Sequence, residues 1–321
     1  MSNIWQKLKK NLGAKPIMIL APMANVTDSP FRRIIICCGR PDLFFNEFVS
    51  CDGLCSSGRD KLLRDLRFTI DEHPIIVQFF GSKPDNFYRC AQLAQELGFD
   101  GIDINMGCPD KSVEKQGAGA ALIKNPKLAQ QIIMETKRGA GPLPVSVKTR
   151  LGYNKIEIKE WIPMLLEMNL DALTIHGRTR KEMSFGPAQW DLIGEVAQMA
   201  HSSETLVIGN GDVSDLADAL SKAKAYDLDG IMVGRGIFKN PWFFNSNIRD
   251  VSKKERIETM AKHIELFTEF WGEGKHFDVM KKFFKVYVNG WDGANDLRIK
   301  LMSAKNQSDV EGIVKSDGTA K

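Results

Sequence analysis

Several residues that could do chemistry stand at or just after the ends of short apolar runs of the sequence. Cys108 lies in a Gly-Cys-Pro turn, Lys148 ends one apolar run and His176 ends another. A strand buried on both faces needs no polar or reactive group, so we expect these side chains to meet at one site. A thiol in a polar turn can act as a general acid. A buried lysine can place its charge beside a cofactor or form a Schiff base.

The elements that would position these residues are short, mostly β-branched runs that alternate with stretches of helical periodicity. The eight runs are 17–20, 43–49, 75–79, 101–104, 145–148, 172–176, 206–209 and 230–233. Their alternation with helices predicts parallel β/α units, which close most simply into a (β/α)8 TIM barrel with its active site at the carboxyl ends of the strands. A doubly wound open sheet is the alternative, but no G-x-G-x-x-G motif opens the first unit.

The last two predicted strands are each followed by a glycine-rich loop. The loops are Gly-Asn-Gly-Asp at 209–212 and Gly-Arg-Gly at 234–236. In a TIM barrel these loops often offer backbone N–H groups to a phosphate, and Arg235 could add a charged hydrogen bond. The glycines could instead only make tight turns. The two loops together favour a phosphate, and flavin mononucleotide (FMN) would then lie across the barrel mouth near Gln78 and Lys148.

The strand pattern ends near residue 250, and helices are predicted at 254–271, 278–288 and 295–303. We therefore expect an FMN-binding barrel domain at 1–250 and a helical domain at 251–321, with a frayed tail after about Gln307. The stretch 275–305 carries seven Lys or Arg and three acidic residues, while the whole chain has a net charge of +4. Its segment 281–287, KKFFKVY, interleaves cations with aromatic rings as RNA-contact surfaces do, although an amphipathic helix has the same pattern.

Composition narrows the class of protein further. The chain is 43% hydrophobic and 26% charged, which excludes global disorder. The six cysteines form no C-x-x-C pair and no metal-ligand spacing. No apolar run approaches the roughly 18 residues of a membrane span. We therefore expect a cytoplasmic protein without a bound metal or a membrane partner.

Six segments resemble the tRNA-dihydrouridine synthase family. They are APMANVTDSPFR (21–32), DINMGCPDKSVEKQGAGAALIKNP (103–126), VKTRLG (147–152), LTIHGRTR (173–180), IGNGDV (208–213) and IMVGRGIFKNPW (231–242). They stand in the family's order across roughly residues 15–245. A weaker likeness after residue 275 covers the family's helical RNA-binding domain. Asn25 stands where the family usually has Gly, and Phe48 where a Met is common.

The resemblance implies an oxidoreductase that reduces the C5–C6 double bond of a specific uridine in tRNA to 5,6-dihydrouridine. NADPH or NADH would reduce bound FMN, hydride would pass from flavin N5 to uracil C6, and Cys108 would give the proton to C5. The target base must be flipped out of the folded tRNA to reach a barrel mouth. No obligate protein partner is predicted.

The same likeness assigns residues to three roles, with Cys108 as the catalytic residue. The FMN site would comprise Pro22, Met23, Ala24, Gln78, Lys148, His176, Asn210, Gly211, Asp212, Gly234 and Arg235. Asn105 and Arg178 are expected to hold the uracil or its flanking ribose and phosphate. The tRNA backbone would contact Lys281, Lys282, Lys285 and Arg298.

Three other functions share part of this pattern. A flavin barrel that reduces a free pyrimidine or small enone would have the same loops without the basic helical region. A flavin-free aldolase would use Lys148 as its Schiff-base residue. An RNA-binding protein with an inactive barrel would not need Cys108 or Lys148.

Overall fold

The computed structural model describes residues 2–247 and 250–318. The chain forms two compact units, one of residues 1–24 and 41–234 and the other of residues 25–40 and 235–321. The predicted domains, 1–250 and 251–321, differ from these units in the placement of segments 25–40 and 235–250. That each predicted domain carries its own function stays a prediction.

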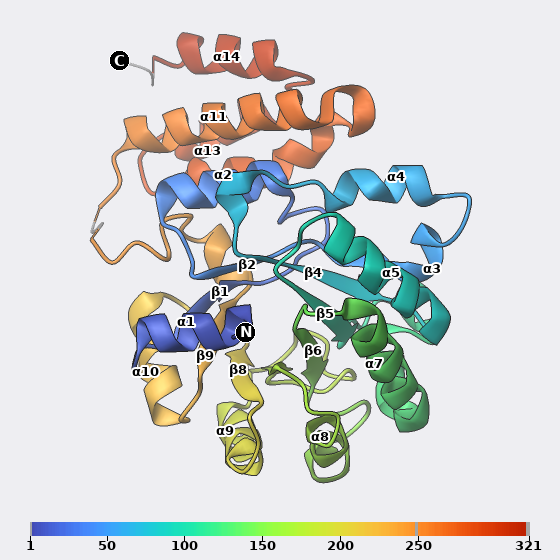
Figure 1. The fold of residues 1–321 in the computed structure, drawn as a ribbon. Coiled ribbons are helices and arrows are strands. Elements are labelled where there is room, and N and C mark those ends of the chain that lie inside the picture. The colour runs from blue at the N-terminus through green and yellow to red at the C-terminus, as the bar shows by residue number, and fades with distance from the viewer. Residues whose placement is uncertain (1, 248–249, 319–321) are drawn as a thin grey trace. The chain divides into compact units, whose positions relative to one another are not determined.

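The first unit is a closed parallel barrel, as the sequence predicts (Figure 1). Its strands run in the order β2-β1-β9-β8-β7-β6-β5-β4-β3, and a further pairing of β2 with β4 closes the ring. The second predicted strand is divided into two short pieces, β2 and β3. The strands are β1 Ile17–Leu20, β2 Leu43–Phe45, β3 Val49–Ser50, β4 Ile75–Phe80, β5 Gly101–Met106, β6 Val145–Arg150, β7 Ala172–His176, β8 Leu206–Asn210 and β9 Gly230–Val233.

Helices of this unit lie outside the ring of strands (Figure 1). They are α1 Ile4–Leu12, α3 Cys51–Leu54, α4 Arg59–Leu63, α5 Pro84–Glu96, α6 Lys111–Glu114, α7 Pro126–Ala140, α8 Ile158–Leu166, α9 Trp190–Ala200 and α10 Leu216–Ala225. Local sequence fixes their starts. The side chain of Asn125 accepts the N–H of Leu128 ahead of Pro126 in α7, and Asp215 caps α10 in the same way.

Helix α1, which the periodicity did not predict, supplies a buried ring to the barrel core. Trp5 is 1% exposed and packs with Ile17, Leu43 and Ile76, residues near the amino ends of their strands. Its helix therefore covers the end of the barrel opposite the carboxyl ends of the strands.

The described residues of the second unit form helices and connecting loops, with no strand among them. The unit contains α2 Ser29–Cys38, the short helices η4 Arg235–Phe238 and η6 Phe277–Met280, and α11 Lys253–Trp271, α12 Lys281–Tyr287, α13 Ala294–Leu301 and α14 Gln307–Ser316. Helix α2 belongs here because Phe31 packs on the rings of His263 and Phe283, at centroid distances of 5.5 and 5.1 Å. The indole N–H of Trp271 also donates to Asp28, the cap of α2, at 2.8 Å.

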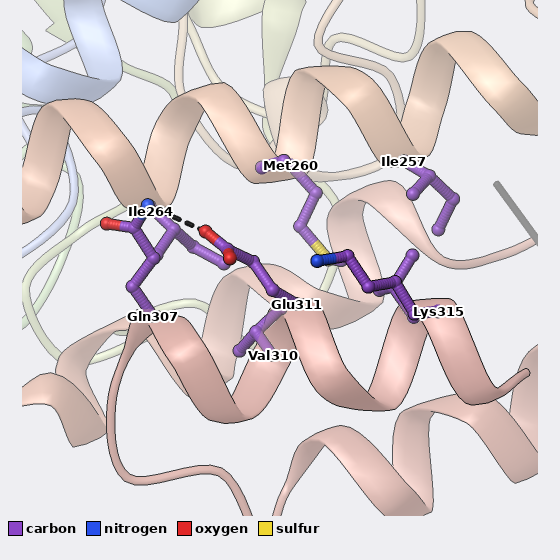
Figure 2. Close-up of a pocket in the computed structure, with 9 residues that line it drawn as sticks. Ile257, Met260, Ile264, Gln307, Val310, Glu311 and Lys315 are labelled. Atoms are coloured by element: carbon purple, nitrogen blue, oxygen red, sulfur yellow. Dashed lines mark hydrogen bonds between the residues drawn. The ribbon is translucent and has the colours of Figure 1, made fainter.

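The expected frayed tail after Gln307 is wrong for residues 307–316, which form α14, and residues 319–321 lie outside the described part. The Asn306 side chain caps the helix by accepting the N–H of Asp309. Val310 is 3% exposed and faces Met260 and Ile264 of α11 beside a hollow of about 170 Å³ (Figure 2). Apolar burial at helical spacing, which a Ser- and Asp-rich composition obscured, is what orders this segment.

Candidate active site

The predicted site residues of β5 to β8 lie at the carboxyl ends of these strands. In the strand register Asn105 pairs with Lys148, Arg150 pairs with His176, and His176 pairs with Asn210. All four strands are parallel, so these residues share the carboxyl end, where TIM barrels place their active sites. The structure thus brings together side chains that are far apart in the sequence.

A chain of buried amides organises one side of this mouth. The Gln78 side chain, fully buried, donates to Asp103 at 2.7 Å and accepts from Nδ2 of Asn105 at 2.9 Å. Asp103 also accepts from the hydroxyl of Ser146 at 2.6 Å. Burial raises the pKa of Asp103 to about 6, against the opposing effect of these hydrogen bonds.

The amide of Asn105 in turn fixes the loop that carries the cysteine. Its Oδ1 accepts the backbone N–H of Gly107 at 3.1 Å and that of Cys108 at 2.8 Å. The carbonyl of Cys108 accepts from Ala120 at 3.0 Å, and a Cβ on Gly119 would lie 2.7 Å from that oxygen. Asn105, which we expected to hold uracil, therefore also positions Cys108.

The thiol of Cys108 is partly exposed, and its protonation suits a proton donor. Burial raises its pKa above the ordinary value, while the positive charges of Arg150 and Lys148 act in the opposite direction. A thiol with a raised pKa keeps its proton at neutral pH, which is the state that a general acid requires.

Lys148 lies beside Asn210 at the same end of the barrel. Its Nζ donates to Oδ1 of Asn210 at 3.0 Å, and Nδ2 of Asn210 donates to the carbonyl of Met232 at 2.8 Å. Burial lowers the pKa of Lys148 to about 8, with a further contribution from the charge of Arg150. An anionic group placed next to Lys148 would therefore stabilise its charged form.

Thr174 has a buried hydroxyl without a hydrogen-bond partner, and it pairs in register with Lys148. Alternation along β7 puts Thr174 on the same face as His176, one residue pair deeper in the barrel. A buried polar atom without a partner is uncommon in proteins, so this hydroxyl marks a place where a bound group could supply a hydrogen bond.

The glycines after β8 and β9 differ in what they require. A Cβ on Gly209 would lie 2.6 Å from the ring of Trp190, and one on Gly211, whose φ is +131°, would lie 2.7 Å from Ala188. Packing alone therefore explains these two glycines. A Cβ on Gly234 would meet only Ala21 and Met23, at the ordinary distance of 3.8 Å. Gly234 leaves room for a group to approach its backbone, which suits the predicted phosphate loop.

Other predicted cofactor residues follow their strands as expected. Pro22, buried, Met23, partly buried, and Ala24, exposed, come directly after β1. Arg235 follows Gly234 in the chain and begins η4 of the second unit. The oxygen Oδ2 of Asp212 accepts the N–H of Ala188 at 2.9 Å.

Arg178 is 1% exposed and holds the loop after β7. It donates to Asp212, to the carbonyl of Gly186, and at 3.3 Å to the carbonyl of Phe185. Its Nη1 also lies 3.3 Å from Nε2 of His176. These contacts give Arg178 a positioning role in addition to the substrate contact that we expected.

Arg150 is a second arginine at this rim, and the sequence analysis did not select it. Its guanidinium donates to the carbonyls of Gly107 at 2.6 Å, Thr179 at 3.0 Å and Met183 at 2.8 Å. It thereby links the cysteine loop to the loop after β7. Phe185 on that loop is 78% exposed, and Arg178 donates to its carbonyl while Arg150 donates to those of Thr179 and Met183. The place of Arg150 within the family-like segment VKTRLG (147–152) was the signal that could have found it.

The predicted RNA-contact residues lie in the second unit and differ in their partners. Lys281 pairs with Asp278 at 2.6 Å, and Arg298 donates to the carbonyl of Val288 at 2.8 Å and to Asn295 at 2.9 Å. Lys282 donates to the carbonyl of Asn25. Lys282 and Lys285 line a hollow of about 540 Å³ together with Phe238, Lys239, Val286 and Asn289.

Two further properties limit the chemistry of the described residues. No group of three or more His, Cys, Asp or Glu side chains in residues 2–247 and 250–318 is arranged to hold a metal ion. No helix among these residues is both long enough and apolar enough to cross a membrane. The class of protein that fold and site define is a TIM-barrel protein with a thiol and a lysine at its carboxyl rim.

Comparison with known proteins makes the assignment specific. The family model described as dihydrouridine synthase matches residues 19–318, and the chain belongs to this family. It is 40% identical to "Probable tRNA-dihydrouridine synthase 2" of Bacillus subtilis (strain 168), over 97% of this chain and 95% of that protein. It is also 40% identical to "Probable tRNA-dihydrouridine synthase" of Staphylococcus aureus (strain Mu50 / ATCC 700699), over 97% and 94% of the two chains.

Solved structures share the fold at low identity. Histamine dehydrogenase from Rhizobium sp. 4-9 superposes with a TM-score of 0.53 and 14% identity, over 78% of this chain and 48% of that one. The 6-hydroxypseudooxynicotine amine oxidase of Pseudomonas geniculata N1 gives 0.54 and 13%, over 77% and 50%. The chain therefore spans about half the length of these two proteins, and the likeness shows the fold alone.

Proposed function

We propose that this chain is a tRNA-dihydrouridine synthase, which reduces the C5–C6 double bond of a uridine in tRNA. The observation that carries the proposal is the placement of Cys108, which Asn105 fixes at the same barrel rim as Lys148. Family membership and the names of the two relatives support the same activity.

The residues at the rim suit FMN as the bound cofactor. The unpartnered hydroxyl of Thr174 and the open approach to Gly234 are the two features that a bound group would use. Gln78 and Lys148 would hold the polar edge of the flavin, and the backbone at Gly234 its phosphate. When bound, FMN would supply the hydride chemistry for reduction of uracil at C6, and NADPH or NADH is the proposed reductant.

The chain's own residues provide the remaining chemistry. Cys108 holds a proton at neutral pH and delivers it from Sγ to uracil C5. Asn105 keeps the thiol loop in place and Arg150 braces it against the loop after β7. The positive charge of Lys148 favours an anionic reduced cofactor.

The second unit is proposed to bind the tRNA backbone. Lys239, Lys282 and Lys285 surround one hollow with the ring of Phe238, which offers cations for phosphate and an aromatic face for a base. Lys281 and Arg298 have partners within the chain, so they would exchange those contacts for phosphate on binding.

Mass spectrometry of unmodified tRNA after incubation with the protein, FMN and NADPH tests this proposal. We expect one uridine to gain two hydrogens, mapped to a single nucleotide by nuclease digestion. Reduction of free uridine or uracil at a comparable rate without tRNA would instead support a reductase of free pyrimidines. A colourless protein trapped on a carbonyl substrate by borohydride would support an aldolase.

A further inference from the structure

Three of the six cysteines gather at a place that the proposed reaction does not use. Cys51 is the first residue of α3, Cys55 follows its last residue, and Cys90 lies in α5. The N–H of Cys55 donates to the carbonyl of Cys51 at 3.0 Å, so one helical turn separates these two residues. Side chains four residues apart project from the same helix face, here towards α5.

Cys90 and Cys55 each place their sulfur atom against the backbone of the facing helix. The Sγ of Cys90 lies 3.9 Å from the carbonyl oxygen of Cys51, and the Sγ of Cys55 lies 4.0 Å from the carbonyl oxygen of Asn86, one turn before Cys90 in α5. Cys51 and Cys90 are at most 1% exposed, whereas Cys55 retains access to solvent.

Metal binding does not account for the cluster, because no three such side chains in the described residues are arranged as metal ligands. The chemistry of the three thiols is instead unequal. Hydrogen bonds from Cys51 and Cys55 lower the pKa of Cys90. Burial raises the pKa of Cys55 to about 11 and that of Cys51 well above its ordinary value. Cys90 is thus the most acidic of the three thiols.

We propose that Cys55 and Cys90 are an oxidation site, which forms a reversible disulfide when the protein meets a hydroperoxide. Cys55, the one of the three cysteines that solvent reaches, attacks the peroxide, the O–O bond breaks, and Cys55 becomes a sulfenic acid as one water leaves. The sulfur of Cys90 then displaces the hydroxyl of the sulfenic acid, the S–S bond forms, and a second water leaves. Overall, two thiols and one hydrogen peroxide give one disulfide and two waters.

This disulfide would tie α3 to α5 next to the barrel rim. Asp52, between the two cysteines of α3, accepts from the Asn86 side chain at 2.7 Å and from the backbone of Ser82, after β4, at 3.5 Å. The bond would therefore reinforce an existing contact between α3, which precedes β4, and the segment 82–86, which follows β4. It would not require the two helices to approach from a distance.

Peptide mapping of the full-length, flavin-loaded protein tests the proposal. The reduced protein is titrated with hydrogen peroxide, its free thiols are blocked with an alkylating reagent, and the digest is analysed without reduction. We expect a cross-linked peptide pair containing Cys55 and Cys90, lighter by two hydrogens than the free peptides, which disappears after dithiothreitol. Cys55→Ser should abolish it, whereas Cys37→Ser, at an exposed cysteine outside the cluster, should leave it unchanged.

Circular dichroism of Cys55→Ser confirms that a lost cross-link does not reflect unfolding. A cross-link between Cys51 and Cys90 would overturn the assignment of the pair. Sulfinic or sulfonic acid at Cys55 without any cross-link would overturn the disulfide itself. So would a protein whose three thiols stay reduced while Cys37 is oxidised.

Discussion

Replacement of Arg150 is expected to loosen the rim of the active site and to change the acidity of Cys108. The buried guanidinium donates to three carbonyls, those of Gly107, Thr179 and Met183. A hydrogen bond from a charged donor contributes about 1.5–3 kcal/mol. Three such bonds sum to about 4.5–9 kcal/mol. Burial of the guanidinium, which lowers the pKa of Arg150 to about 10, offsets part of this sum, so Arg150→Ala should lower the free energy of unfolding by about 3–5 kcal/mol.

The same substitution removes a positive charge that lowers the pKa of the Cys108 thiol. Arg150→Ala should therefore raise that pKa further. Arg150→Lys is the matched control, because it keeps the charge and loses the planar fork of donors. It should destabilise the protein but leave the thiol pKa close to that of the wild type.

Two assays separate these effects. Urea denaturation measures the free energy of unfolding, and the pH dependence of iodoacetamide alkylation at Cys108, followed by mass spectrometry, measures the thiol pKa. The reasoning is refuted if Arg150→Lys is as stable as the wild type, or if Arg150→Ala alkylates with an unchanged pH midpoint.

Three further predictions concern Lys148 in the barrel, Val310 in α14 and the lysines of the second unit. Lys148 has a folded-state pKa of about 8 against 10.5, so its charge destabilises the fold fully below pH 8 and progressively less as the pH rises towards 10.5. Lys148→Met should therefore stabilise the flavin-free protein by about 2 kcal/mol at pH 7, after loss of its hydrogen bond, and the gain should vanish near pH 10 in denaturant titrations. Val310→Ala should destabilise the helical unit by about 2 kcal/mol in thermal melts, whereas exposed Glu311→Ala should change little. In tRNA-binding titrations, three Lys→Gln changes should flatten the slope of log affinity against log salt by roughly 2 units, and Lys281→Gln alone should change it less. The three positions are Lys239, Lys282 and Lys285.

The sequence predicted the barrel because its strands are buried on both faces and therefore form continuous apolar runs. The prediction of one continuous second strand, 43–49, was wrong, because the chain leaves the sheet at Asn46 and Glu47 between β2 and β3. The sequence could not assign segment 25–40 to the second unit, because Phe31 contacts His263 of α11, a residue that is distant in the sequence. Hydrophobic periodicity predicts which type of element a segment forms, but not which other element it packs against.

The sequence predicted where the site residues lie but not how they are connected. It placed Cys108 and Lys148 at strand ends, and in the structure Lys148 pairs with Asn105 of β5 while Cys108 follows β5 by two residues; their roles stay predictions. The bracing role of Arg150 could not be predicted, because its three acceptors are backbone carbonyls that carry no side-chain signature. The sequence also does not distinguish Gly211, where a Cβ would clash with Ala188, from Gly234, where a Cβ would fit.

A single-turnover experiment with Cys108→Ala tests directly whether Cys108 donates the proton to uracil C5. The variant is loaded with FMN, reduced anaerobically with NADPH and mixed with unmodified tRNA, and dihydrouridine is then quantified by mass spectrometry. Cys37→Ala serves as the control at an exposed cysteine. We predict that Cys108→Ala reduces its flavin and binds tRNA as the wild type does but forms little dihydrouridine, while the control forms it normally. Dihydrouridine formation by Cys108→Ala at the wild-type rate would contradict the account.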